Sequence, residues 1–317
     1  MAISNKMPSL PESYAALSLP DVKLYHHPRS SPTPTKVIVV ELHRPEAKNA
    51  FTGAMLHSLV AAFNMLSADP RVKAVVLTGS DPANKTFCAG MDLAFSSRDD
   101  GDGSPALEQE DTRETHRDGG GLVALAIYNC TKPVVAALNG SAVGVGITMT
   151  LPANIRVVSR DAKVGFVFAR RGISMEACSS FFLPRLIGAA KALHLVTTGA
   201  VYAPDHPLLR DLFGEVVAPD QVLPRALALA DEIATHTSAV STRVMKDLIY
   251  RGGETPEAAH AVESKVIFDL FRSKDFLEGV ASFKERRAPD FRGTVEEDAP
   301  RVWPWWEWNR VPEKSKI

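Results

Sequence analysis

Two apolar segments, each a predicted strand that ends in a glycine turn, constrain the fold more than any other feature. The first runs from Lys73 to Gly79 and resumes after a polar loop as Phe87-Cys-Ala-Gly-Met-Asp-Leu93. The second runs from Lys132 to Gly140 and continues as Ser-Ala-Val-Gly-Val-Gly146. Both lead into a helical pattern, which leaves backbone N–H groups at a helix start open to a ligand. Two such turns facing one pocket can bind an oxygen that becomes negatively charged.

Predicted strands and helices alternate through the first two thirds of the chain. The expected strands are Asp21–His26, Lys36–His43, Val72–Leu77, Val134–Leu138 and Ile155–Ser159. The expected helices are one capped by Thr52, one over Leu122–Asn129 and one over Phe181–Gly199. This alternation predicts an α/β core with parallel strands.

Beyond Pro219 the apolar pattern is helical throughout. It predicts helices over Leu223–His236, Ser241–Tyr250, Thr255–Phe271 and Lys274–Arg286. We therefore expect an N-terminal arm (1–20), a core (21–218), a helical region (219–291) and a tail (292–317). All four tryptophans fall in the tail, where we expect them to pack on the protein's own surface or on a neighbouring subunit. The charged, glycine-containing residues 98–121 are predicted to form a flexible insertion over the substrate entrance.

Composition excludes several classes of protein. Hydrophobic residues make up 45% of the chain, and 36 basic residues balance 37 acidic ones, so we expect no nucleic-acid partner. No apolar run approaches the ~20 residues that span a bilayer, so no membrane partner is expected. The three cysteines argue against a disulfide framework and favour a reducing compartment. The histidines show no metal-ligand spacing, so no metal site is expected.

Four segments in order resemble the crotonase (enoyl-CoA hydratase/isomerase) superfamily. Phe87–Leu93 and Asn139–Gly146 resemble its two glycine loops, Pro45–Ala50 resembles its first coenzyme A loop, and Phe166–Glu176 resembles its acid/base segment. The likeness extends from Val37 to Phe291. It implies a ββα spiral core with a C-terminal helical region, which assembles into homotrimers or hexamers.

The resemblance also implies an acyl-CoA thioester as the substrate, with coenzyme A present only as part of it and no separate cofactor. The backbone N–H groups of Met91 and Val145 would bind the thioester oxygen, although Val145 replaces the middle member of the family's usual triple glycine. The residues expected to bind substrate or coenzyme A are Ala47, Lys48, Ala89, Gly90, Asp92, Leu93, Gly144, Thr148 and Phe168.

Glu176 is the candidate acid/base. A thioester held by two N–H donors has an acidic α-proton, which a carboxylate in a dry pocket can remove. Burial would raise the pKa of Glu176 and a helix N-terminus would lower it, and the sequence leaves that balance open. Within the resemblance, the two glutamates of hydratases are replaced by Thr148 and Phe168, whereas Glu176 matches the acid/base position of peroxisomal-type Δ3,Δ2-enoyl-CoA isomerases.

Three functions follow as alternatives. The first is an enoyl-CoA isomerase that shifts a 3-enoyl double bond to the 2-position. The second is a hydratase, or a related acyl-CoA lyase of secondary metabolism. The third is a non-catalytic acyl-CoA-binding subunit.

The last three residues, Ser315-Lys316-Ile317, differ from the Ser-Lys-Leu peroxisomal address by one aliphatic substitution. This ending predicts a peroxisomal location and an import receptor as a partner. The alternative is the cytoplasm.

Overall fold

The computed structural model describes residues 10–92 and 112–307. The chain divides into two compact units. Unit 1 comprises residues 1–130 and 134–231, and unit 2 comprises residues 131–133 and 232–317. Unit 1 contains the sheets, whereas unit 2 is helical in its described part.

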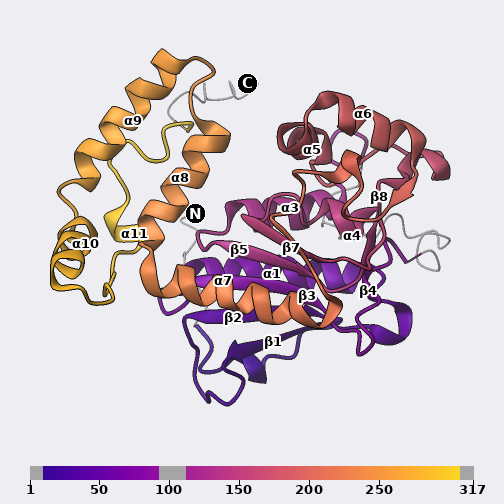
Figure 1. The fold of residues 1–317 in the computed structure, drawn as a ribbon, viewed down its shortest axis with the longest axis horizontal. Coiled ribbons are helices and arrows are strands. Elements are labelled where there is room, and N and C mark those ends of the chain that lie inside the picture. The colour runs from indigo at the N-terminus through magenta and orange to yellow at the C-terminus, as the bar shows by residue number, and fades with distance from the viewer. Residues whose placement is uncertain (1–9, 93–111, 308–317) are drawn as a thin grey trace. The chain divides into compact units, whose positions relative to one another are not determined.

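A six-stranded sheet organises unit 1 (Figure 1). Its strands, in spatial order, are β1 (Val22–His27), β2 (Val37–Leu42), β3 (Ala74–Gly79), β5 (Val134–Leu138), β7 (Ile155–Ser159) and β10 (Glu215–Val217). Only β1 and β2 pair antiparallel. Every residue of β3 and β5 is buried, as expected of central parallel strands covered on both faces. The predicted α/β core with parallel strands is confirmed.

A smaller sheet carries the two glycine turns. Its strands, in order, are β4 (Thr86–Cys88), β6 (Ser141–Val143), β8 (Val164–Gly165) and β9 (Val201–Tyr202). The first two strands pair in parallel, with Thr86 opposite Ser141 and Cys88 opposite Ala142. Parallel strands end at the same edge of a sheet, so the turns that follow β4 and β6 emerge side by side.

The helices of unit 1 are α1 (Gly53–Ala68), α3 (Gly119–Asn129), α4 (Val145–Thr148), α5 (Ser179–Ile187) and α6 (Ala189–Thr198), and α7 (Val222–His236) begins in it. Short 3-10 turns are η1 (Tyr14–Ala16), η2 (Pro45–Ala47), η3 (Val167–Arg171), η4 (Pro207–Leu209) and η5 (Pro219–Gln221). Thr52 caps α1 as predicted, since its hydroxyl accepts the Met55 N–H at 3.0 Å. Tyr14 of η1 is fully buried and donates to Asp69, which anchors the end of the N-terminal arm.

Two predicted helices differ from the structure. The helix expected at Leu122 begins at Gly119, because the Asp118 side chain caps it by accepting the Gly121 N–H. It therefore occupies the end of the predicted insertion 98–121, whose first part lies outside the described residues. The prediction of a single helix over Phe181–Gly199 is wrong. Gly188, with φ 82°, separates α5 from α6.

Unit 2 is built from α8 (Ala239–Arg251), α9 (Pro256–Leu270), α10 (Lys274–Glu285) and α11 (Val295–Asp298). Its core consists of Val240, Val244, Val266, Val302 and Trp305. In the tail, the Trp303 Nε1 donates to Asp247 at 2.8 Å and the Trp305 Nε1 donates to the Arg251 carbonyl at 2.7 Å. The expected packing of tryptophans on the protein's own surface is therefore confirmed for these two.

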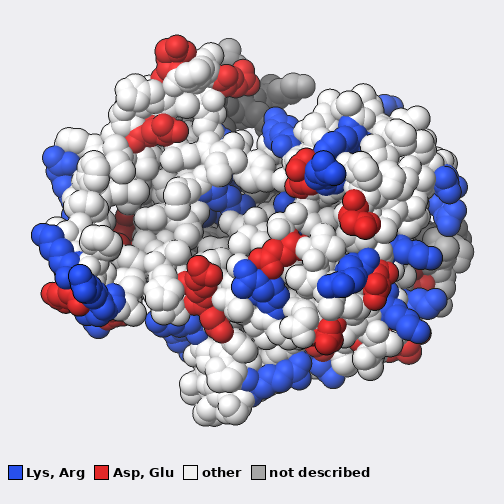
Figure 2. Space-filling model, in the orientation of Figure 1, with Lys and Arg blue, Asp and Glu red and all other residues white. Residues whose placement is uncertain are grey.

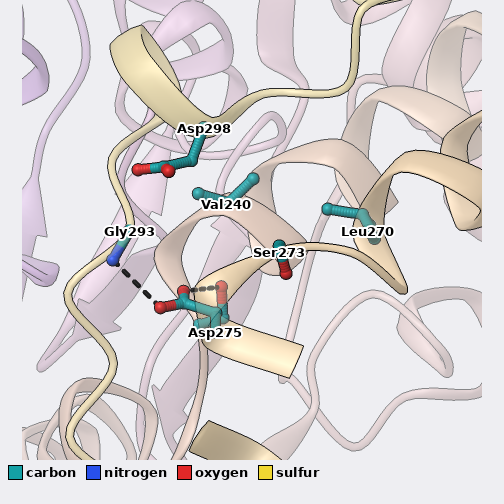
Figure 3. Close-up of a pocket in the computed structure, with 7 residues that line it drawn as sticks. Val240, Leu270, Ser273, Asp275, Gly293 and Asp298 are labelled. Atoms are coloured by element: carbon teal, nitrogen blue, oxygen red, sulfur yellow. Dashed lines mark hydrogen bonds between the residues drawn. The ribbon is translucent and has the colours of Figure 1, made fainter. Parts of the chain in front are cut away.

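A small cavity in unit 2 is structural. Asp275 lies at its wall, next to Gly293 (Figure 3). The carboxylate of Asp275 accepts the Ser238 hydroxyl at 2.6 Å and the Gly293 N–H at 3.0 Å. The cavity measures about 10 Å³, no more than one water molecule needs. We infer that the contacts around this cavity hold the chain after α10 in place, and that the cavity does not bind substrate.

On the face shown in Figure 2, acidic and basic side chains are interspersed, and neither kind forms one large charged patch. Within residues 10–92 and 112–307, no helix is long and apolar enough to cross a membrane. The same residues contain no cluster of three or more His, Cys, Asp or Glu side chains suited to a metal ion.

Candidate active site

The two glycine turns meet beyond the ends of β4 and β6. Gly90 has φ +98° and Gly144 has φ +56°, conformations that L-residues rarely adopt. A Cβ placed on Gly144 would lie 4.0 Å from the Gly90 Cα, so the backbones of the two turns are in contact. The structure therefore brings together the two segments that the sequence predicted to face one pocket.

The backbone N–H of Met91 points away from Phe51, the residue with which Met91 pairs. Met91 forms a parallel bridge with Phe51, in which the Phe51 N–H donates to the Gly90 carbonyl at 2.8 Å and the Asp92 N–H donates to the Phe51 carbonyl at 3.0 Å. Both bonds use the neighbours of Met91, so its own N–H points to the opposite side. A donor of this kind is free to face a ligand.

Val145 provides the second expected donor as the first residue of α4. The first N–H groups of a helix have no partner within it. No carbonyl among the described residues accepts the Val145 N–H outside the helix and strand ladders. Its side chain is buried. Gly146 lies so close to β4 that an added Cβ would be 2.5 Å from the Cys88 carbonyl oxygen, which explains glycine there.

The predicted coenzyme A loop is tied to the first glycine turn. Lys48 is exposed with φ 54°, and its carbonyl accepts the N–H of the exposed Ala89 at 3.1 Å. Arg44 forms an ion pair with Asp92 at 3.0 Å, and Ala47 ends the intervening 3-10 turn η2. The structure thus brings Ala47, Lys48, Ala89, Gly90 and Asp92 into one region. Leu93 lies outside the described residues.

Glu176 lies in the turn that precedes α5. Its Oε1 accepts the Thr148 hydroxyl at 2.6 Å, which places the carboxyl beside α4, one turn from Val145. Burial raises the pKa of Glu176 to about 7, with a further contribution from the neighbouring Asp118 and an opposing one from the Thr148 hydrogen bond. A carboxyl group with this pKa accepts and returns a proton near neutrality.

Phe168, the other position that replaces a hydratase glutamate in the resemblance, lies buried in η3. Its carbonyl accepts the Ile173 N–H at 3.2 Å. No described contact joins its side chain to Glu176, so of the two replaced positions the hydrogen bonds connect only Thr148 to the candidate acid/base.

The sequence reasoning missed Asp118. Its Oδ1 accepts the Gly121 N–H at 2.6 Å and the Ala177 N–H at 3.2 Å. Gly120 lies directly against Glu176, because an added Cβ would overlap the Glu176 Oε2. An aspartate followed by three glycines and an apolar run is a helix-capping pattern, and that pattern was the available signal for the start of α3. Nothing local in the sequence indicates the contact with residues 176 and 177.

Comparison with known proteins adds to this geometry. The family model described as "Enoyl-CoA hydratase/isomerase" matches residues 33–294. The chain is 48% identical over 264 residues to "Enoyl-CoA hydratase AFT3-1" of Alternaria alternata, covering 83% of this chain and 85% of that protein. It is 33% identical over 256 residues to a "Probable enoyl-CoA hydratase" of Rhodobacter capsulatus, covering 80% of this chain and 94% of that one.

Solved structures show the same fold. A probable enoyl-CoA hydratase/isomerase from Mycobacterium abscessus aligns with a TM-score of 0.73 at 29% identity, covering 86% of this chain and all of that one. The expected spiral core with additional C-terminal helices is therefore confirmed.

Proposed function

The chain belongs to the enoyl-CoA hydratase/isomerase (crotonase) family, and on that premise we propose that it shifts the double bond of a 3-enoyl-CoA thioester to the 2-position. The observation that carries this proposal is the Glu176 carboxyl, whose pKa is raised to about 7 and which accepts the hydroxyl of Thr148 in α4. One carboxyl with this pKa can both remove and deliver a proton.

The proposed reaction is a proton transfer within one pocket. The N–H groups of Met91 and Val145 bind the thioester oxygen. Glu176 removes a proton from C2, and the electron pair moves onto that oxygen to give an enolate. The protonated Glu176 then delivers the proton to C4 as the double bond forms between C2 and C3. No atom is gained or lost.

Hydration of a 2-enoyl-CoA is the second candidate, and two observations favour it. The relatives at 48% and 33% identity carry hydratase names. Asp118 also gives Glu176 a carboxylate neighbour, and paired carboxyl groups suit the activation of a water molecule. In this reaction Glu176 would remove a proton from water as the oxygen adds to C3, and the protonated Glu176 would then deliver that proton to C2.

Incubation of the purified protein with 3-enoyl-CoA and, separately, 2-enoyl-CoA distinguishes these functions. Isomerisation converts the first substrate without a change in mass in ordinary water. Hydration increases the mass of the second substrate by one water molecule. Binding of both without conversion would support the non-catalytic acyl-CoA-binding alternative and contradict both reactions.

The remaining substrate contacts are also proposals. Ala47, Lys48, Ala89 and Asp92 surround the region where the predicted coenzyme A loop meets the first glycine turn. We propose that coenzyme A lies there, with Lys48 as the cation available to a phosphate because its side chain is exposed. Exchange of Lys48 for Ala should raise KM for the CoA thioester more than for the shorter pantetheine thioester of the same acyl group.

We also propose an oligomeric state and a cellular location for the protein. The family resemblance supports a homotrimer or hexamer. The Ser315-Lys316-Ile317 sequence supports recognition by a peroxisomal import receptor, although it lies outside the described residues. A fusion with an N-terminal fluorescent protein should co-localise with a peroxisomal marker, and removal of the three residues should make it cytosolic.

A further inference from the structure

We propose that Asp118 is a positioning residue for Glu176: it fixes the turn that carries Glu176 and places a second carboxyl group beside that of Glu176. The inference rests on the proposed function only where it treats Glu176 as the group that transfers protons. Asp118 itself is not assigned any contact with substrate.

Asp118 joins two segments of the chain by hydrogen bonds. One oxygen of Asp118, Oδ1, accepts the Gly121 N–H at the start of α3 and the Ala177 N–H directly after Glu176. Gly121 is close to Asp118 in the sequence, whereas Ala177 lies 59 residues away from it. A single side chain therefore connects the start of α3 to the turn that carries the candidate acid/base.

The turn that carries Glu176 has an unusual backbone conformation. Ala177 has φ 56° and Cys178 has φ 55°, so two consecutive residues other than glycine lie in the left-handed region. Such residues persist only where surrounding contacts hold them. Those contacts include the Asp118 hydrogen bond to Ala177 and two bonds from Ser179 to the Glu176 carbonyl, at 3.0 Å from its N–H and 2.5 Å from its hydroxyl. Like the Thr148 bond to the Glu176 side chain, the Asp118 bond connects the turn to another element, and loss of Asp118 removes it.

Asp118 also acts on Glu176 through its charge. Among the described residues, the polar and titratable groups that interact with Glu176 include Thr148 from α4, Asp118 from the start of α3, Cys88 from β4 and Cys178 from its own turn. Burial raises the pKa of both thiols, so they stay neutral near pH 7. Asp118 accepts two N–H groups at the start of α3. Its carboxyl group beside Glu176 contributes to the raised pKa of Glu176, because a like charge nearby disfavours ionisation.

Two variants separate position from charge. Asp118→Asn keeps an oxygen that can accept both N–H groups but removes the charge. Asp118→Ala removes both. The direct readout is a ¹³C NMR titration of the glutamate side-chain carboxyls, in which the Glu176 signal is identified by its absence from the Glu176→Gln protein. This measurement needs no turnover.

We expect Asp118→Asn to lower the midpoint of the Glu176 titration by roughly one pH unit, the size typical of a close like charge. The acid limb of the kcat/KM profile should move with it, and the melting temperature should stay near that of the native protein. Asp118→Ala should reduce kcat by about tenfold or more with little change in KM, because the turn is no longer held while substrate contacts remain.

A Glu176 midpoint unchanged in Asp118→Asn would overturn the charge part of the proposal. A folded Asp118→Ala protein with native kcat would overturn the positioning part. Should the protein convert neither enoyl-CoA, the proposed function fails, yet a lowered Glu176 midpoint in Asp118→Asn would still support the pairing of the two carboxyls. The two failures are thus distinguishable.

Discussion

At the scale of single residues, the Thr148 hydroxyl has one proton and two acceptors. It lies 2.6 Å from Glu176 Oε1 and 3.2 Å from the Gly144 carbonyl. When Glu176 is ionised, the hydroxyl proton stabilises its charge. When Glu176 is protonated, the hydroxyl can turn toward Gly144 and accept a hydrogen bond from the carboxyl group instead. Thr148 therefore suits both states through which a proton-transferring carboxyl must pass.

Exchange of Glu176 for Gln tests the acid/base role. The amide keeps the shape of the side chain but cannot take a proton, so we expect kcat to fall by about 10² to 10⁴. Binding of an acyl-CoA, measured by calorimetry, should persist. The exposed Glu254 provides the matched control, and Glu254→Gln should retain native kcat. Near-native turnover by Glu176→Gln would place the base elsewhere.

Stability should depend on pH through the same residue. The pKa of Glu176 is raised in the folded protein from 4.5 to about 7, so the folded state binds more protons between these values. The stabilising contribution of Glu176 is complete below pH 4.5 and is lost as the pH rises through 7. Relative to Glu176→Gln, the native protein should lose at most about 3 kcal/mol between pH 4.5 and pH 8. Urea unfolding of both proteins at several pH values measures this, and parallel curves would contradict the raised pKa.

At the scale of elements, the parallel pairing of β4 with β6 places both expected oxyanion donors. Because a Cβ added to Gly146 would lie 2.5 Å from the Cys88 carbonyl oxygen, Gly146→Ala must move the start of α4 away from β4. We expect kcat to fall by about 10² to 10³, the loss typical of one oxyanion donor. Gly90→Pro should be equally harmful, since proline cannot adopt φ +98°. Met91→Ala is the control and should be mild, because only its backbone is used.

The helices and strands differ in how accurately their bounds could be predicted from the sequence. Val134–Leu138 and Ile155–Ser159 were predicted to the residue, because short β-branched runs bounded by turns admit few other structures. The start of α3 was missed because three glycines have low helix propensity, which the Asp118 cap overcomes. The break at Gly188 was missed because the apolar pattern continues across it. The Asp118–Ala177 contact depends on tertiary folding, so no local pattern can predict it.

At the scale of the whole molecule, unit 2 exposes apolar side chains on α9, α10 and the turn between them. Phe283 is 85% exposed, Leu277 63%, Phe268 57% and Phe271 52%. An oligomer of the kind proposed would cover such surface. We expect light scattering to show a trimer or larger for the native chain and a smaller species for Phe283→Asp. Glu263→Arg, a change at an exposed polar residue of α9, should leave the assembly intact. A native chain that is monomeric at all concentrations would contradict the proposal.

The burial of the Cys88 thiol affects how well the protein resists chemical modification by an enoyl thioester. A 2-enoyl thioester is an electrophile that a thiolate attacks at C3, and such an adduct would block the protein. Burial raises the pKa of Cys88 to about 12, and its Sγ donates toward the Gly90 carbonyl at 3.9 Å. The nucleophilic form of sulfur is thus almost absent beside the glycine turns. The burial of Cys88 under the glycine turns therefore also protects this thiol from alkylation by an enoyl thioester.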